Sequence, residues 1–185
     1  MSSQPSLKKV CFYKVFPSPV GSLKLVASDH GLVAILWEND DPKRVPLDSL
    51  QQNETHPILL ETERQLNAYF TGKLKQFSVT LDFVTGTEFQ KRVWAALLAI
   101  PFGETRTYAQ IAEQIGNPKA VRAVGAANGR NPISIIAPCH RVIGTNGKLT
   151  GFAGGLETKS FLLEIESQDG KTEYQRPLFN LTDQK

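Results

Sequence analysis

Cys139 and His140 are neighbours in the segment APCHRVIG, and this pair could carry out nucleophilic chemistry. A nearby positive or proton-accepting group favours the thiolate, the form of cysteine that attacks, and both His140 and Arg141 are such groups. The alternative is a structural cysteine next to an ordinary histidine, because free cysteines are commonly buried. We expect that structural role for Cys11, which lies in an apolar-rich strand.

Two short helices joined by a tight turn precede the cysteine. Thr107 and Gln110 form a capping box that begins the first helix, and Gly116 ends it. Asn117 is expected to cap the second helix, with Pro118 at its first position. Two short helices around a Gly-Asn-Pro turn predict a helix-turn-helix.

The second helix offers mostly small side chains and one long cation, Arg122. Small side chains let a backbone approach a narrow groove, which suits sequence-tolerant binding in the DNA minor groove. They equally suit packing against the partner helix, and we expect both because the helix has two faces. Asn117, at the helix N-terminus, is placed to contact a phosphate. The small residues are Ala123, Gly125, Ala126 and Ala127.

The positive charge of the chain is concentrated in its central part. The formal net charge is +3 over 185 residues, yet residues 87–156 hold eight Lys or Arg against three Asp or Glu, whereas residues 1–86 hold nine of each. A local basic surface favours a polyanion such as nucleic acid. A solvated charged face is the alternative.

The composition also excludes several classes of protein. No apolar run approaches the roughly 20 residues that a membrane helix needs. The first residues lack the long apolar core of a secretion signal. Cys11 and Cys139 are too few for a disulfide framework, so we expect a reducing, cytoplasmic setting and no membrane association.

An antiparallel meander is predicted near the N-terminus, because residues 8–16, 22–28 and 32–37 have strand patterns separated by turn sequences. Residues 38–56 are polar and are predicted as a loop.

Two further elements are expected before the helix-turn-helix. A helix is predicted over residues 57–70 and a strand over residues 78–83. The pattern changes near residue 85, where Thr87 and Gln90 form a second capping box for a helix that Pro101 helps to end.

After the helix-turn-helix, residues 133–137 predict a short strand, the Asn-Gly pair at 146–147 a hairpin, and residues 157–167 a last helix. Together these elements predict a winged helix. We therefore expect an α+β chain with an N-terminal domain over 1–85, a C-terminal DNA-binding domain over 86–168 and a polar tail over 169–185.

These segments resemble a known family, the O6-alkylguanine-DNA alkyltransferases (methylated-DNA–protein-cysteine methyltransferases). The resemblance rests on TYAQIAEQIGNPKAVRAVGAANGRNP, NPISIIAPCHRVIG and TGFAGG, and it is closest to the bacterial stand-alone members. The stretch from Phe89 to Glu166 matches throughout, and the N-terminal part matches more loosely. The resemblance implies a small RNase H-like domain with an antiparallel sheet, followed by a winged helix-turn-helix domain.

The resemblance implies DNA repair by direct reversal of damage. Such a protein binds duplex DNA through the minor groove and swings the damaged nucleotide out of the stack, because the alkyl group is out of reach inside the duplex. It then moves the alkyl group from O6 of guanine, or O4 of thymine, to Cys139. The thioether is a poor leaving group, so each chain acts once. The family implies a monomer without a cofactor, and cooperative clustering on DNA stays open.

The resemblance also implies roles for residues around the cysteine. Glu166, His140 and a water are expected to relay the cysteine proton, by the logic of catalytic triads. Tyr108 is expected to crowd the phosphate of the flipped nucleotide and to donate toward N3 of guanine. Arg122 would fill the gap in the stack, and Asn131 would be a hinge between the second helix and the cysteine segment.

Further contacts follow from the resemblance. The carbonyls of Cys139 and Val142 would accept from the guanine amino group, and the backbone N–H of Ala153 would lie near O6. The residues expected to contact DNA are Tyr108, Ala109, Asn117, Arg122, Ala123, Gly125, Ala126 and Thr145. The residues expected to line the substrate pocket are Ser134, Val142, Phe152 and Ala153.

Three departures from the family matter. Ala153 stands where relatives often have serine, so only its backbone contact carries over. Ser134 stands where vertebrate members have proline, so a more open wall is expected, with room for larger adducts or O4-alkylthymine. Some relatives bind zinc through two cysteines and two histidines, but here only Cys11, His30 and His56 are available, so no metal is expected.

Three other classes compete with the alkyl acceptor. A non-catalytic lesion-binding relative would carry tryptophan at position 139. A winged-helix transcription factor would present longer polar side chains on the helix that contains Arg122. A cysteine hydrolase would turn over repeatedly. Cys139 argues against the lesion-binding relative, and the small-residue helix argues against the transcription factor. A limit of one group per chain would argue against the hydrolase.

Overall fold

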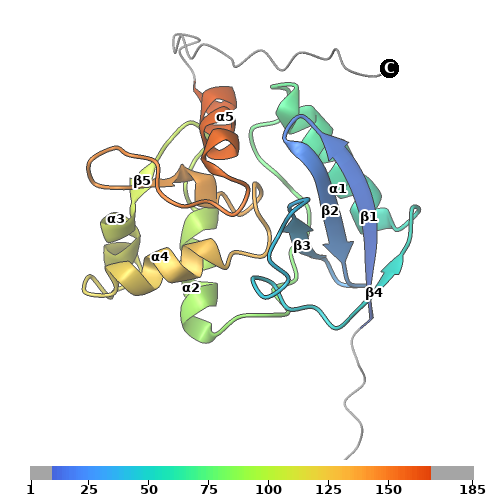
Figure 1. Cartoon of the computed structure of the whole chain (residues 1–185), viewed down its shortest axis with the longest axis horizontal. Helices are drawn as coiled ribbons and strands as arrows, with labels where there is room; N and C mark the ends of the chain where they lie inside the picture. The colour runs from blue at the N-terminus through green and yellow to red at the C-terminus, as the bar shows by residue number, and fades with distance from the viewer. Residues whose placement is uncertain (1–9, 168–185) are drawn as a thin grey trace, which may run out of the picture.

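A small mixed sheet forms the N-terminal part of the chain in the computed structural model, which describes residues 10–167 (Figure 1). Strands β1 (Val10–Ser18), β2 (Gly21–Ala27) and β3 (Leu32–Leu36) are antiparallel neighbours, which confirms the predicted meander. Strand β4 (Ser49–Gln52) pairs in parallel with β1. The prediction that residues 38–56 are all loop was therefore wrong. Only Leu50 of β4 is apolar and half-buried, and its other three residues are polar and exposed, so it lacks the apolar alternation by which a strand is recognised.

Helix α1 (Pro57–Phe70) forms as predicted and packs against the sheet (Figure 1). It buries Leu59, Leu66 and Tyr69 in the main hydrophobic core. Its apolar side chains follow helical spacing, which is why the sequence located this helix well.

Strand β3 forms one edge of the sheet, and two later segments of the chain bond to this edge. The strand predicted over 78–83 does not form, because only Leu32 pairs with this segment: its N–H donates to the Thr80 carbonyl at 2.8 Å and its carbonyl accepts from Asp82 at 2.8 Å. Farther along the same edge, the Ile35 N–H donates to the Pro132 carbonyl at 2.9 Å. These bonds cover an otherwise open edge and join the two parts of the molecule.

Three helices form the core of the C-terminal part: α2 (Glu88–Leu98), α3 (Tyr108–Gln114) and α4 (Val121–Gly129). Both predicted capping boxes are confirmed, with reciprocal bonds between the backbone and side chains of Thr87 and Gln90 and of Thr107 and Gln110.

The predicted start of the second helix of the pair was wrong. Ala120, and not Asn117, is the N-cap of α4, and it makes no side-chain capping bond. The carbonyl of Asn117 accepts from the N–H of Ala120, and the N–H of Asn117 donates to the Ala112 carbonyl, each at 2.9 Å. The Gly-Asn-Pro segment therefore forms a turn that reverses the chain, and the helix begins only after it.

Two short strands and a last helix complete the described chain. Strands β5 (Arg106–Thr107) and β6 (Val142–Ile143) pair in parallel, and helix α5 (Leu156–Glu166) follows (Figure 1). The Asn-Gly pair forms a tight turn, with Gly147 at φ +74° and its N–H bonded to the Gly144 carbonyl at 2.9 Å. Strand β6 leads into this turn, but within residues 10–167 no strand lies between it and α5 to pair with β6, so the predicted hairpin was wrong. The polar tail lies outside the described residues.

The hydrophobic core does not stop at the predicted boundary near residue 85. The core under the sheet also takes in Ile133, Ile135, Ile136, Ala137 and Leu162 from the C-terminal half. A second core contains Trp94 and Cys139 and lies among the helices. The α+β class is confirmed, and none of the helices between residues 10 and 167 is long and apolar enough to cross a membrane.

Candidate active site

The segment that carries the cysteine is buried along its whole length, from Asn131 to Val142. It is not the predicted strand. Its backbone makes short-range bonds instead, and Ile135 has a φ of +74°, which is unusual for a β-branched residue. Cys139 begins a single turn of 3-10 helix that ends at Arg141. The chain thus turns tightly inside the protein and places Cys139 in the core among the helices.

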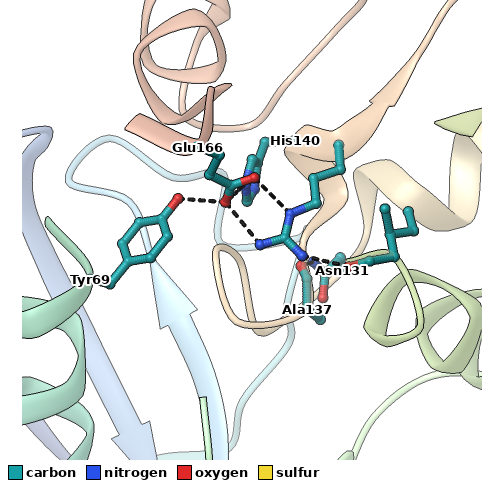
Figure 2. Close-up of polar contacts among 7 residues, drawn as sticks. Tyr69, Asn131, Ala137, His140 and Glu166 are labelled. Carbon is teal, nitrogen blue, oxygen red and sulfur yellow. Dashed lines mark hydrogen bonds and ion pairs between the residues drawn. The ribbon is translucent and has the colours of Figure 1, made fainter. Parts of the chain in front are cut away.

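Asn131 holds this turn in place (Figure 2). Its side-chain nitrogen donates to the Ala137 carbonyl at 2.7 Å, and its side-chain oxygen accepts from the Ile133 N–H at 3.1 Å. The Asn131 carbonyl in turn accepts from the Arg44 guanidinium at 2.5 Å, and Arg44 is paired with Asp40. Asn131 follows the C-cap residue of α4, Arg130, so it lies between that helix and the cysteine segment, where the resemblance expects a hinge.

Cys139 is a buried, neutral thiol in the resting protein. Its side chain is 4% exposed, and burial raises the pKa of the thiol above its ordinary value. The nearby side chains of Asn131 and Ser134 and the charges of Arg44 and Lys159 oppose this pKa shift without cancelling it. Arg141, the cation that follows the Cys-His pair in the chain, is bonded to Glu166 and to the Ile100 carbonyl, so the charges that favour the thiolate come from Arg44 and Lys159. A nucleophile here needs a base.

Glu166 is the acceptor at which the surrounding polar groups converge (Figure 2). Its Oε1 accepts from the Tyr69 hydroxyl at 2.7 Å, from His140 Nε2 at 2.7 Å and from Arg141 Nη2 at 2.9 Å. Its Oε2 accepts from Arg141 Nε at 2.7 Å. These bonds from His140 and Arg141 lower the pKa of Glu166 to about 2 despite burial, so the carboxylate is ionised.

The ionised carboxylate fixes the tautomer of His140. A carboxylate can only accept, so Nε2 must carry the hydrogen, and Nδ1 is left with a free lone pair. Within the described chain, Nδ1 is buried and has no hydrogen-bond partner. Burial lowers the pKa of His140, although Glu166 opposes that shift. A neutral imidazole with an unused lone pair, next to a cysteine in the chain, is suited to accept a proton.

The sequence predicted Cys139, His140 and Glu166 but not the groups that hold them. Tyr69 comes from α1, in the N-terminal part, and nothing in its local sequence distinguishes it from a core aromatic. Lys159 is fully buried, and its ammonium group donates to the carbonyls of Val142 at 2.6 Å and Thr150 at 3.1 Å. Its helical spacing from the buried Leu162 was a signal that could have identified it.

Both carbonyls expected to accept from guanine already have a donor. The Val142 carbonyl accepts from Lys159, and the Cys139 carbonyl accepts from the Val142 N–H and from the Asn128 side chain at 3.5 Å. Each oxygen has two lone pairs, so the Val142 carbonyl keeps one for a ligand.

Helix α4 has the two faces that its composition predicts. Val124, Ala127 and Asn128 are buried, and the Trp94 indole N–H donates to the Ala127 carbonyl at 2.9 Å. The opposite face carries exposed residues, so small side chains and one cation remain available to a partner. Those exposed residues are Arg122, Ala123 and Ala126, with Gly125 half-buried beside the Tyr108 ring.

The other expected contact residues lie around this face. Asn117 and Thr145 are exposed, and Ala109 is half-buried. Tyr108 begins α3, and its hydroxyl lies 2.8 Å from the hydroxyl of Thr150.

The expected pocket residues differ in exposure. Ser134 and Val142 are buried, Phe152 is half-buried and Ala153 is exposed. Phe152 packs against both hydrophobic cores, including the one that contains Cys139.

A helical DNA-binding domain with a buried cysteine, a neutral histidine and an oriented carboxylate defines a class of proteins that act on DNA through a thiol. Comparison with known proteins agrees. Residues 11–83 match the ribonuclease-like domain of 6-O-methylguanine DNA methyltransferase, and residues 88–168 match the DNA-binding domain of the same family. The chain belongs to the methylated-DNA–protein-cysteine methyltransferase family.

Individual relatives are similar over most of their length. A methylated-DNA–protein-cysteine methyltransferase of Methanosarcina acetivorans is 55% identical over 155 residues, which cover 84% of this chain and 97% of the relative. One from Mycobacterium tuberculosis is 50% identical and covers 83% of this chain and 91% of the relative. The crystal structure of Mycobacterium tuberculosis OGT in complex with DNA has a TM-score of 0.75 at 49% identity, covering 84% of this chain and 92% of that one.

The lowered pKa makes Glu166 a source of pH-dependent stability. Because its pKa of about 2 lies below the ordinary 4.5, the stabilisation is complete above about pH 4.5 and is lost as the pH falls from there toward 2. Glu166→Gln should lower the free energy of unfolding by about 3 to 5 kcal/mol at pH 7, and the difference from the parent protein should shrink toward pH 2.5.

Urea unfolding between pH 2.5 and 7 measures this difference. Glu164→Gln, an exposed change on the same helix, is the control and should alter the stability by less than about 0.5 kcal/mol. A stability difference between Glu166→Gln and the parent that stays constant over the whole pH range would contradict the assignment.

Proposed function

We propose that this protein repairs DNA directly, by moving the alkyl group from O6-alkylguanine to Cys139 in a reaction that each chain performs once. The observation that supports it best is the buried thiol beside a neutral histidine whose tautomer is fixed by Glu166. Membership of the methylated-DNA–protein-cysteine methyltransferase family supplies the substrate class.

The proton comes off the thiol as the sulfur attacks. His140 takes the Cys139 proton on Nδ1, by way of one water, while Glu166 stabilises the imidazolium that forms. The new bond joins Sγ to the alkyl carbon, and the bond between that carbon and O6 breaks with its electron pair left on guanine. The proton finally restores neutral guanine. The thioether product has no charge and is a poor leaving group, so the chain is consumed.

The depth of the cysteine requires the base to leave the DNA stack. A sulfur that is 4% exposed cannot touch a base inside a duplex, so the nucleotide must be swung into the protein. The exposed small side chains of α4 allow its backbone to enter the minor groove. Arg122 fills the space that the base leaves, and Tyr108 exchanges its bond with Thr150 for contacts to the flipped nucleotide.

We extend the proposal to larger adducts and to O4-alkylthymine. Ser134 is buried in the cysteine segment and has a smaller side chain than the proline of vertebrate relatives. The Val142 carbonyl keeps a free lone pair for a guanine amino group, and Ala153 is an exposed residue whose backbone N–H is proposed to contact O6. A rate of methyl transfer comparable to that of relatives, with no transfer of larger groups, would count against this extension.

Transfer should stop at one alkyl group per chain and should depend on one cysteine. With excess duplex carrying labelled O6-methylguanine, label on the protein should reach a ceiling of one group per chain. Cys139→Ala should abolish transfer, while the affinity for the duplex changes little because the side chain lies beneath the DNA-facing helix. Scintillation counting and mass spectrometry of the protein measure this.

Cys11→Ala is the matched control, because Cys11 is also buried and unbridged but lies in β1. It should leave the ceiling at one group. More than one group released per chain would point to a hydrolase, and label on the Cys139→Ala protein would refute the assignment.

Arg122 should matter more for transfer than for binding. Flipping a base costs a few kcal/mol, and a side chain that fills the gap offsets part of that cost. Arg122→Ala should therefore slow transfer at saturating DNA by about tenfold or more, with a smaller loss of affinity.

Arg130→Ala removes the same charge at the other end of α4 and should weaken binding without this added loss of rate. Equal effects of the two variants on the rate at saturating DNA would show that Arg122 acts only as a charge. Single-turnover kinetics and a binding titration separate the two quantities.

A further inference from the structure

Trp37 of the N-terminal domain touches the glycine-rich loop of the C-terminal domain, residues 151–155. A side chain placed on Gly154 would have its Cβ 2.8 to 2.9 Å from atoms of the indole, so the ring lies directly against the loop backbone. The same ring meets Phe152 edge to face, with centroids 5.4 Å apart. Trp37 is 7% exposed, and the contact is therefore part of the packed interior.

The backbone that carries the indole is held from the side of the sheet. Trp37 follows β3 directly, and β3 is bonded through Ile35 to Pro132, in the cysteine segment. The backbone N–H of Trp37 donates to an Asp40 carboxylate oxygen at 3.1 Å, and Asp40 pairs with Arg44. Strand β3 and the adjoining Trp37 therefore contact both the segment that carries Cys139 and the loop 151–155.

Phe152 lies where this contact can affect the cysteine. It packs against the core that contains Trp37 and also against the core that contains Cys139. We expect movement of the loop away from the indole to bring Phe152 closer to the core that contains Cys139, and removal of the indole to leave space into which the loop can retreat. Because protein interiors are close-packed, the ring sets how far the loop can yield.

We infer that Trp37 determines the largest alkyl adduct that the site admits, by supporting the loop 151–155 at a fixed distance from Cys139. The inference rests on the proposed alkyl transfer. Trp37 is a positioning residue, since its indole acts through Gly154 and Phe152, and it makes the N-terminal domain a determinant of substrate size.

Two substitutions with opposite effects test this. Trp37→Ala should raise the ratio of the transfer rate from O6-benzylguanine to that from O6-methylguanine by about tenfold, because the larger group can push the loop back. Gly154→Ala should lower that ratio, because the added methyl group forces the loop off the ring. In the double variant the effect of Gly154→Ala should largely disappear, since residues in contact are coupled.

The ratio of rates separates this role from loss of stability. Phe16→Ala, which removes a buried ring from β1 in the same core, is the control and should leave the ratio unchanged. Additive effects in the double variant, or an unchanged ratio in Trp37→Ala, would overturn the inference. Methyl transfer by the unaltered protein is measured first: if it fails, the proposed function fails, whereas normal methyl transfer with an unchanged ratio rejects only the role of Trp37.

Discussion

One carboxylate, that of Glu166, organises the chemistry of this molecule. It is buried, ionised and bonded by Tyr69, His140 and Arg141, which come from two separate parts of the chain. Its charge would be costly to bury without these donors. With them it stays ionised, and it forces the hydrogen of the histidine onto Nε2. The opposite nitrogen is left free to take a proton, and a thiol that burial keeps neutral acquires a base.

The N-terminal domain supports the chemistry without supplying a reacting atom. Tyr69 reaches Glu166 from α1, Arg44 binds the carbonyl of Asn131, and the edge of β3 pairs with Pro132. Trp37 adds a contact to the glycine-rich loop. The hydrophobic core under the sheet also joins the two domains, because its residues come from both halves of the chain. The site is therefore held between two domains, and a change in either can move it.

Local signals in the sequence were enough for the helices and for the nucleophile. Capping boxes at Thr87 and Thr107 marked two helix starts, and the Cys-His pair marked the site. The errors at the site share a physical cause, which is that long-range contacts decided the outcome. After its one pairing with Ile35 of β3, the cysteine segment satisfies its backbone through the Asn131 side chain and short-range bonds instead of a continued strand pairing. Arg141 turns to Glu166, and burial keeps the Cys139 thiol neutral. Tyr69 and Lys159 contact the site only because the folded chain brings them there from positions that are distant in sequence.

The protonation state of His140 is the most direct test of this account. Nitrogen-15 NMR of the histidine side chains, assigned by comparison with a His140→Gln variant, distinguishes the two tautomers and the imidazolium. The account predicts a neutral ring at pH 7 with the hydrogen on Nε2 and none on Nδ1. A ring that carries its hydrogen on Nδ1, or that is doubly protonated at pH 7, would leave Cys139 without a base and contradict the mechanism.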